Sequence, residues 1–145
     1  MKAGFIIGLV VAVLMGCFAF VQGQAAPGPG NVLEGRVAPD AVDVSLVQLI
    51  ATPERFHGKR VRVIGFVRLE FEGDAIYLHG DDYKHRLSRN GLWIDVPEKM
   101  EARRAEFDRR YVLIEGVFDA QNRGHLDSFS GSIRNLNRYM ARTRR

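Results

Sequence analysis

The sequence predicts a small, mainly β domain with five strands and a helix between the third and fourth strands. Apolar and polar residues alternate along 60–72 (RVRVIGFVRLEFE), which is the period of a β-strand. A second strand-like run at 111–119 (YVLIEGVFD) has, like the first, a glycine near its centre, Gly65 in one and Gly116 in the other. Because glycine weakens a strand interior, it usually marks a bend, a bulge or a close backbone approach.

A short helix is expected before the first strand, in SLVQLIA (45–51). Ser45 and Gln48 have the spacing of a capping box, and apolar residues at 46, 49 and 50 form one face of a helical turn. Pro53 is expected to end this helix, and Gly58 to turn the chain into the strand.

The first strand is expected to form a hairpin with the residues that follow a two-residue turn in EGDA (72–75). This register separates an apolar face from a mixed polar and aromatic face. The pairs are Phe71 with Ile76 and Leu69 with Leu78 on the first face, and Glu70 with Tyr77 and Arg68 with His79 on the second.

The second half of the domain is predicted as loop, strand, helix, strand and strand. A polar loop covers 80–91, and a strand follows at 92–96 with Trp93 facing outward. Pro97 opens a helix over 98–110, in which Met100 and Phe107 lie two turns apart. The strand at 111–119 and a fifth strand around Ile133 complete the series.

This order of elements resembles the OB-fold, a five-stranded barrel whose helix lies between strands three and four. The resemblance covers roughly 44–138 and depends on the element order and on the matching runs VRVIGFV and VLIEGVF. Three segments are also similar in sequence to small exported bacterial OB-fold proteins, several of them lipoproteins: ATPERFHGKRVRVIG, YVLIEGVFD and GSI. The resemblance implies a barrel domain over 43–138, with Gly65 at the bend of its long first strand.

The N-terminus predicts export. One lysine is followed by 19 uncharged, mostly apolar residues from Ala3 to Val21, and then by small residues. Cleavage after Ala25, lipidation of Cys17 in LMGC, and retention as an uncleaved anchor are three alternatives. Each leaves the domain outside the cytoplasm, either in the periplasm or attached to a membrane and facing the periplasm. Residues 1–25 are therefore interpreted as a signal peptide or anchor, and 26–42 as a flexible linker.

The positive charge is concentrated at the C-terminus. The formal net charge is +4, but 40–133 holds 14 Lys and Arg against 16 Asp and Glu. Residues 139–145 are expected to be a basic tail. Its arginines, with the one preceding it, could attract an anionic membrane surface: Arg138, Arg142, Arg144 and Arg145.

No catalytic motif appears, so neither an enzyme nor a cofactor is expected. Ser128, Ser130 and Ser132 in DSFSGS do not form a nucleophile elbow. Two histidines and two aspartates in HGDDYKH (79–85) could bind a metal, but a solvated loop is the preferred interpretation. No metal site is therefore assigned.

The candidate binding surface is the outer face of the first three strands. Three aromatic and two basic side chains are expected to share it: Phe66, Tyr77, Trp93, Arg68 and His79. OB-folds hold oligonucleotides or oligosaccharides on this face. The alternative is that a helix, loop or tail covers the rings as a second small core. The function expected is an exported, non-enzymatic module that binds a protein, glycan or envelope component. A domain that binds single-stranded DNA or RNA is the alternative.

Overall fold

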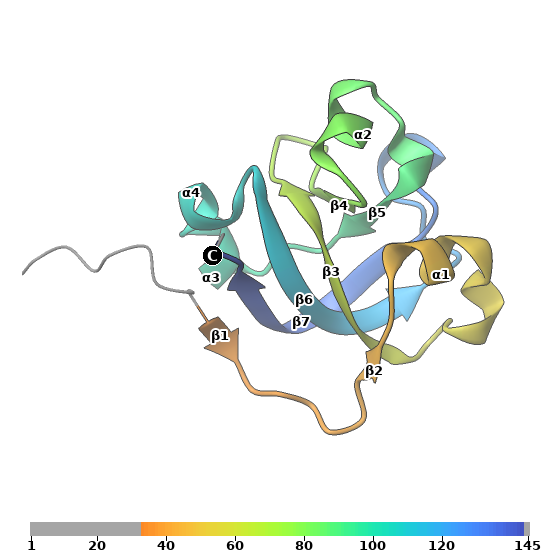
Figure 1. Ribbon diagram of the computed structural model, residues 1–145, viewed down its shortest axis with the longest axis horizontal. Coiled ribbons are helices and arrows are strands. Elements are labelled where there is room, and N and C mark those ends of the chain that lie inside the picture. The colour runs from red at the N-terminus through yellow and green to blue at the C-terminus, as the bar shows by residue number, and fades with distance from the viewer. Residues whose placement is uncertain (1–32, 144–145) are drawn as a thin grey trace, which may run out of the picture.

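The computed structural model describes residues 33–143 (Figure 1). The predicted export segment, Cys17, Arg144 and Arg145 lie outside these residues. The strands are β1 (Leu33–Gly35), β2 (Val42–Asp43), β3 (Arg60–Arg68), β4 (Ala75–Tyr77), β5 (Gly91–Ile94), β6 (Arg110–Asp119) and β7 (Ser132–Ala141). The helices are α1 (Leu46–Ala51), α2 (Gly80–Lys84), α3 (Glu98–Glu101) and α4 (Arg104–Phe107), with 3-10 turns η1 (Pro53–Arg55), η2 (Ser88–Asn90) and η3 (His125–Asp127).

Five of the strands close into a barrel, in the order β3, β4, β5, β7, β6 and back to β3. The β5–β7 pair is parallel, and the other four pairs of the barrel are antiparallel. Helices α3 and α4 lie between the third and fourth barrel strands in the chain. The predicted fold class is therefore confirmed as a mainly β, closed five-stranded barrel, consistent with an OB-like barrel.

The apolar face of β3 enters the core as the alternation predicts. Val61, Val63 and Val67 are at most 1% exposed. Helix α1 adds Leu46 and Leu49 to this core, and α3 and α4 add Met100 and Phe107, all nearly inaccessible to solvent. In Figure 1, α1 lies on one side of the barrel, and α3 and α4 lie on the opposite side. The capping box of Ser45 and Gln48 is present at the start of α1.

The two central glycines are sites of close approach. A Cβ atom on Gly65 would lie 2.6 Å from the carbonyl oxygen of Tyr77 and 2.7 Å from Leu46 Cδ1. A Cβ atom on Gly116 would lie 2.7 Å from the carbonyl oxygen of Arg134, and the β6–β7 register shifts at this point, between Glu115 and Val117. A side chain at either position would therefore collide with a neighbouring strand.

The predicted hairpin register is wrong by four residues. The observed pairs are Phe66 with Tyr77, Val67 with Ile76 and Arg68 with Ala75, so a six-residue loop (69–74) replaces the two-residue turn. Because side chains alternate between the two faces of a strand, a register shift of four residues leaves each residue of the paired strands on its predicted face. Phe71 lies in this loop and is 91% exposed, whereas the predicted register placed it on the apolar face.

Three segments differ from their predicted boundaries. The single helix expected over 98–110 is divided into α3 and α4, and the loop expected over 80–91 contains α2 and η2. The expected linker contains β1 and the start of β2, which pair with β7 and β3.

Strand β7 continues to Ala141, into the segment expected to be a basic tail. Tyr139 and Ala141 are buried there. Arg138 lies within the strand, with its side chain only 15% exposed and its Nη1 atom 3.9 Å from a carboxylate oxygen of Glu115. Arg138, which was expected to face an anionic surface, is therefore largely covered and directed toward Glu115.

Candidate binding groove

Two of the predicted site residues lie in a second, small aromatic core. Tyr77 is only 5% exposed and Trp93 is half-buried. Phe129 packs between them, with ring centroids 6.2 Å from Tyr77 and 5.8 Å from Trp93. Tyr83 from α2 contacts Tyr77 edge to face at 5.9 Å. The loops around α2 and before β7 therefore cover these two rings.

Phe66 and His79 lie in a separate group. The Phe66 ring packs edge to face against Tyr111 of β6 at 5.8 Å. His79 is exposed, and its Nδ1 atom is 3.4 Å from the Tyr111 hydroxyl. The structure therefore divides the predicted face into two groups of rings.

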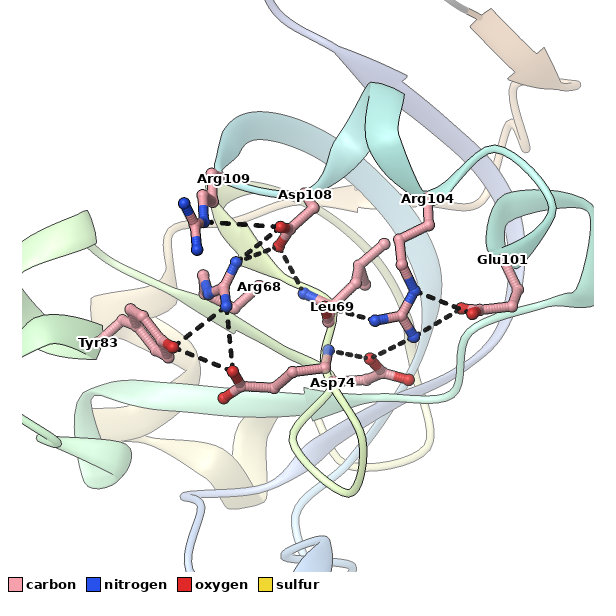
Figure 2. Close-up of polar contacts among 9 residues, drawn as sticks. Arg68, Leu69, Asp74, Tyr83, Glu101, Arg104, Asp108 and Arg109 are labelled. Atoms are coloured by element: carbon pink, nitrogen blue, oxygen red, sulfur yellow. Dashed lines mark hydrogen bonds and ion pairs between the residues drawn. The ribbon is translucent and has the colours of Figure 1, made fainter.

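Arg68 is buried, and both terminal nitrogens of its guanidinium are hydrogen-bonded within the protein (Figure 2), whereas its Nε atom has no hydrogen-bond partner among the described residues. Its Nη1 atom donates to Asp108 at 2.7 Å, and its Nη2 atom donates to Glu70 at 3.0 Å and to the Tyr83 hydroxyl at 3.1 Å. Its guanidinium also lies 4.4 Å from the centre of the Tyr83 ring. Burial opposes the charge, but the Tyr83 hydrogen bond and the charges of Asp108 and Glu70 prevail and raise the pKa of Arg68. These contacts make Arg68 a support for its surroundings and leave it poorly placed to contact a ligand.

The same network fixes the 69–74 loop (Figure 2). The N–H of Leu69 donates to Asp108 at 2.9 Å, and the N–H of Glu70 donates to Asp74 at 2.9 Å. Arg104 Nη1 donates to the Leu69 carbonyl at 2.6 Å. Because side chains take the hydrogen bonds that a sheet partner would otherwise make, the β3–β4 ladder ends at Arg68.

A groove of about 610 Å³ lies between this loop, the α2–η2 segment and the 120–131 loop, and we call it the loop groove. Tyr77, Tyr83 and Phe129 contribute aromatic side chains to its lining. The remaining lining residues are mostly charged or small and polar: Glu70, Glu72, Gly73, Lys84, Arg86, Ser88, His125 and Ser128. OB-folds bind their ligands between the corresponding loops, over strands two and three.

Two large apolar side chains do not line the loop groove themselves, but each is exposed beside a residue that does, and we call these two its rim. Phe71 is 91% exposed and Leu126 is 83% exposed, each at the tip of a loop. The neighbours of these residues, Glu72 and His125, approach each other at 3.7 Å and so bring the two loop tips together. Exposed apolar side chains that surround a concave surface often mark an interaction site.

Backbone strain is concentrated in the same loops. Of the six non-glycine residues with positive φ in the described part of the chain, four lie there: Glu72, Arg86, Leu126 and Asp127. Such conformations cost free energy and tend to persist at ligand sites.

Sequence reasoning missed the residues that complete the groove. Tyr83 and Phe129 are each the one aromatic residue of a polar segment, in GDDYKH and DSFSGS. A single aromatic residue in an otherwise polar segment was the available signal that the segment packs against the domain, because a fully exposed loop does not need a large ring. Asp82, one of the two aspartates in HGDDYKH, accepts hydrogen bonds from the N–H of His79 and from Asn90 Nδ2, both at 2.8 Å. Asp82 is therefore engaged in fixing the start of α2.

Within 33–143, no cluster of three or more histidine, cysteine or acidic side chains is arranged to hold a metal ion. Over the same residues, no helix has the length and apolar character needed to cross a membrane. Comparisons of the chain with models of protein families, with curated proteins and with solved structures gave no match.

Proposed function

We propose that this protein is an exported, non-enzymatic binding module that uses the loop groove to bind another protein. The observation that carries the proposal is the groove itself, with Phe71 and Leu126 exposed at its rim and aromatic rings in its lining. A few well-packed side chains supply most of the binding free energy of an interface, and exposed apolar side chains beside a concave surface often mark one. The export part of the proposal rests on the uncharged run from Ala3 to Val21.

The charges of the groove favour a protein over a nucleic acid. Glu70 and Glu72 line one wall, and Lys84 and Arg86 line the other, so the formal charges of these four residues cancel. A groove for single-stranded nucleic acid needs a continuous positive track for the phosphates. Carboxylates in the wall would repel that backbone, whereas a polypeptide of mixed character can match both walls.

Site-specific photo-crosslinking in the native host tests the proposal. A photoreactive phenylalanine analogue replaces Phe71 in one variant and Leu126 in a second. A third variant carries it at Val37, which is 57% exposed and lies between β1 and β2. Figure 1 shows that segment at the opposite end of the molecule from α2, so Val37 is a matched control.

The expected result is that positions 71 and 126 capture the same protein and position 37 does not. The double variant F71S/L126S should also lose at least tenfold in affinity for that protein, with an unchanged melting temperature because both side chains are exposed. Capture of only polysaccharide or nucleic acid at 71 and 126 would overturn the proposed ligand class. Equal capture at all three positions would show that the groove is not the site.

A further inference from the structure

The loop groove continues into a second hollow of about 470 Å³. The two share three lining residues, Arg86, Ser88 and Ser128. The second hollow adds Leu87 and Leu126, which are 49% and 83% exposed. A ligand that follows both hollows would therefore pass Arg86 and reach exposed apolar side chains beyond it.

The carboxylates of the two hollows already have partners within the protein. Glu70 accepts hydrogen bonds from Arg68 and Tyr83, both at 3.0 Å. Glu72 lies 3.7 Å from His125, and Asp127 lies 3.7 Å from Arg123. Glu70 and Asp127 therefore each have an arginine as neighbour, whereas Glu72 faces the His125 ring.

The basic side chains of the two hollows do not all have a carboxylate partner. Lys84 is paired with Asp81 at 2.8 Å, but the guanidinium of Arg86 has no hydrogen bond or ion pair with any residue in 33–143. Arg89 donates from Nη1 to the carbonyl of Phe129 at 3.0 Å and pairs with no carboxylate in the described chain. Arg86, where the hollows meet, and Arg89, in the second hollow, therefore present positive charge that no carboxylate of the described residues pairs with.

The backbone holds Arg86 at this junction. Its φ is +56°, and its N–H donates to the carbonyl of Tyr83 at 3.0 Å. Left-handed backbone is unfavourable for a side chain as large as arginine, and it tends to be kept where a ligand uses it.

We propose that the segment of the partner that enters the groove is acidic, with one of its carboxylates bound by Arg86 and Arg89 and its apolar side chains on Leu87 and Leu126. This inference rests on the proposed function and adds to it the chemistry of the partner. A guanidinium fork binds a carboxylate through charge-assisted hydrogen bonds. Two cations match a peptide carboxylate, whereas a phosphate backbone would also meet Glu70 and Glu72 in the adjoining wall.

Synthetic probes test the acidic segment with the full chain. Three fluorescent eight-residue peptides alternate leucine with glutamate, with glutamine or with lysine, and an eight-nucleotide oligothymidylate is the phosphate probe. Fluorescence anisotropy at low salt measures the dissociation constant of each probe. The variants are R86Q, the charge reversal R86E, and the control R142Q, since Arg142 is exposed and follows β7 outside both hollows.

The glutamate peptide should bind about tenfold more tightly than the glutamine peptide, which is the effect of one charge-assisted hydrogen bond. R86Q should remove this preference, R86E should transfer it to the lysine peptide, and R142Q should leave it unchanged. A glutamate peptide that binds no better than the glutamine peptide would overturn the inference. So would oligothymidylate binding that depends on Arg86 while the peptide does not bind.

The experiments distinguish failure of this inference from failure of the proposed function. If F71S/L126S abolishes capture of the partner and R86Q does not alter it, the groove binds a protein, and the inference that the bound segment is acidic is wrong. If F71S/L126S leaves capture unchanged, the proposed function fails, whatever the peptides do.

Discussion

Glu115 is a carboxylate with no solvent exposure in the middle of β6, and it fastens the segment before α1 to the barrel. It accepts hydrogen bonds from the N–H of Ala38 at 2.8 Å, from Arg62 Nε at 2.9 Å and from Asn137 Nδ2 at 2.7 Å. These donors come from three parts of the chain. One side chain therefore links the polypeptide before β2 to β3 and β7.

The environment of Glu115 lowers the pKa of its carboxyl below the ordinary value of 4.5. Burial alone would raise this pKa, but the hydrogen bonds from Asn137, Ala38 and Arg62 outweigh burial. The unfolded chain therefore binds the proton more readily than the folded protein. The stability that Glu115 supplies is complete above about pH 4.5 and is lost as the pH falls through the lower folded-state value.

Replacing Glu115 by glutamine should lower the free energy of unfolding by about 3 kcal/mol at neutral pH, because Arg62 and Arg138 lose their buried partner. Urea denaturation measures this change, with Glu101→Gln as the control. Glu101 pairs with Arg104 at the surface, so its loss should cost less than about 1 kcal/mol. The variant should also lose less stability than the wild type between pH 6 and pH 3, as pH-dependent melting would show. An identical acid profile for E115Q and wild type would refute this role.

Strand β7 is the element that closes the barrel, because it pairs with β5, β6 and β1. Its last residues are structural. Tyr139 packs edge to face on Phe107 at 5.2 Å, while Met140 and Ala141 pair with Leu113 and Val112. An arginine-rich segment was expected to be a solvated tail, but the apolar residues within it continue the strand.

Deleting residues 139–145 should destabilise the protein by at least 3–5 kcal/mol, the usual cost of removing a buried aromatic side chain. The deletion also removes the residues that pair with Leu33 and Glu34 of β1. Deleting only 144–145 keeps the whole of β7 and should leave the melting temperature unchanged. Circular dichroism melting curves compare the two truncations. Coincident curves would mean that the end of β7 does not contribute to the fold.

At the scale of the whole molecule, the sequence predicted what depends on local pattern. The first nine residues of the alternation expected over 60–72 form β3, the capping box of Ser45 opens α1, and the central glycines are two sites of close strand packing. The hairpin register could not be read in this way. It depends on Asp108, which is 39 residues from Leu69 and takes the hydrogen bond of the Leu69 N–H.

The candidate site was predictable only in part, for the same reason. The alternation placed Tyr77 and Trp93 on one face, and both lie in the second aromatic core. That Phe129 covers them, and that Asp108 and Tyr83 engage Arg68, depends on loops that meet only when the barrel closes. Each loop taken alone has the composition of a solvated segment.

Hydrogen–deuterium exchange of the full chain, free and bound to the protein captured through positions 71 and 126, tests the central claim most directly. Binding in the loop groove predicts slower exchange of backbone amides in 70–73, 83–89 and 125–129, and no change in 36–41. Protection confined to α1 and the segment before it, with the three groove segments unchanged in a fully bound sample, would contradict the claim.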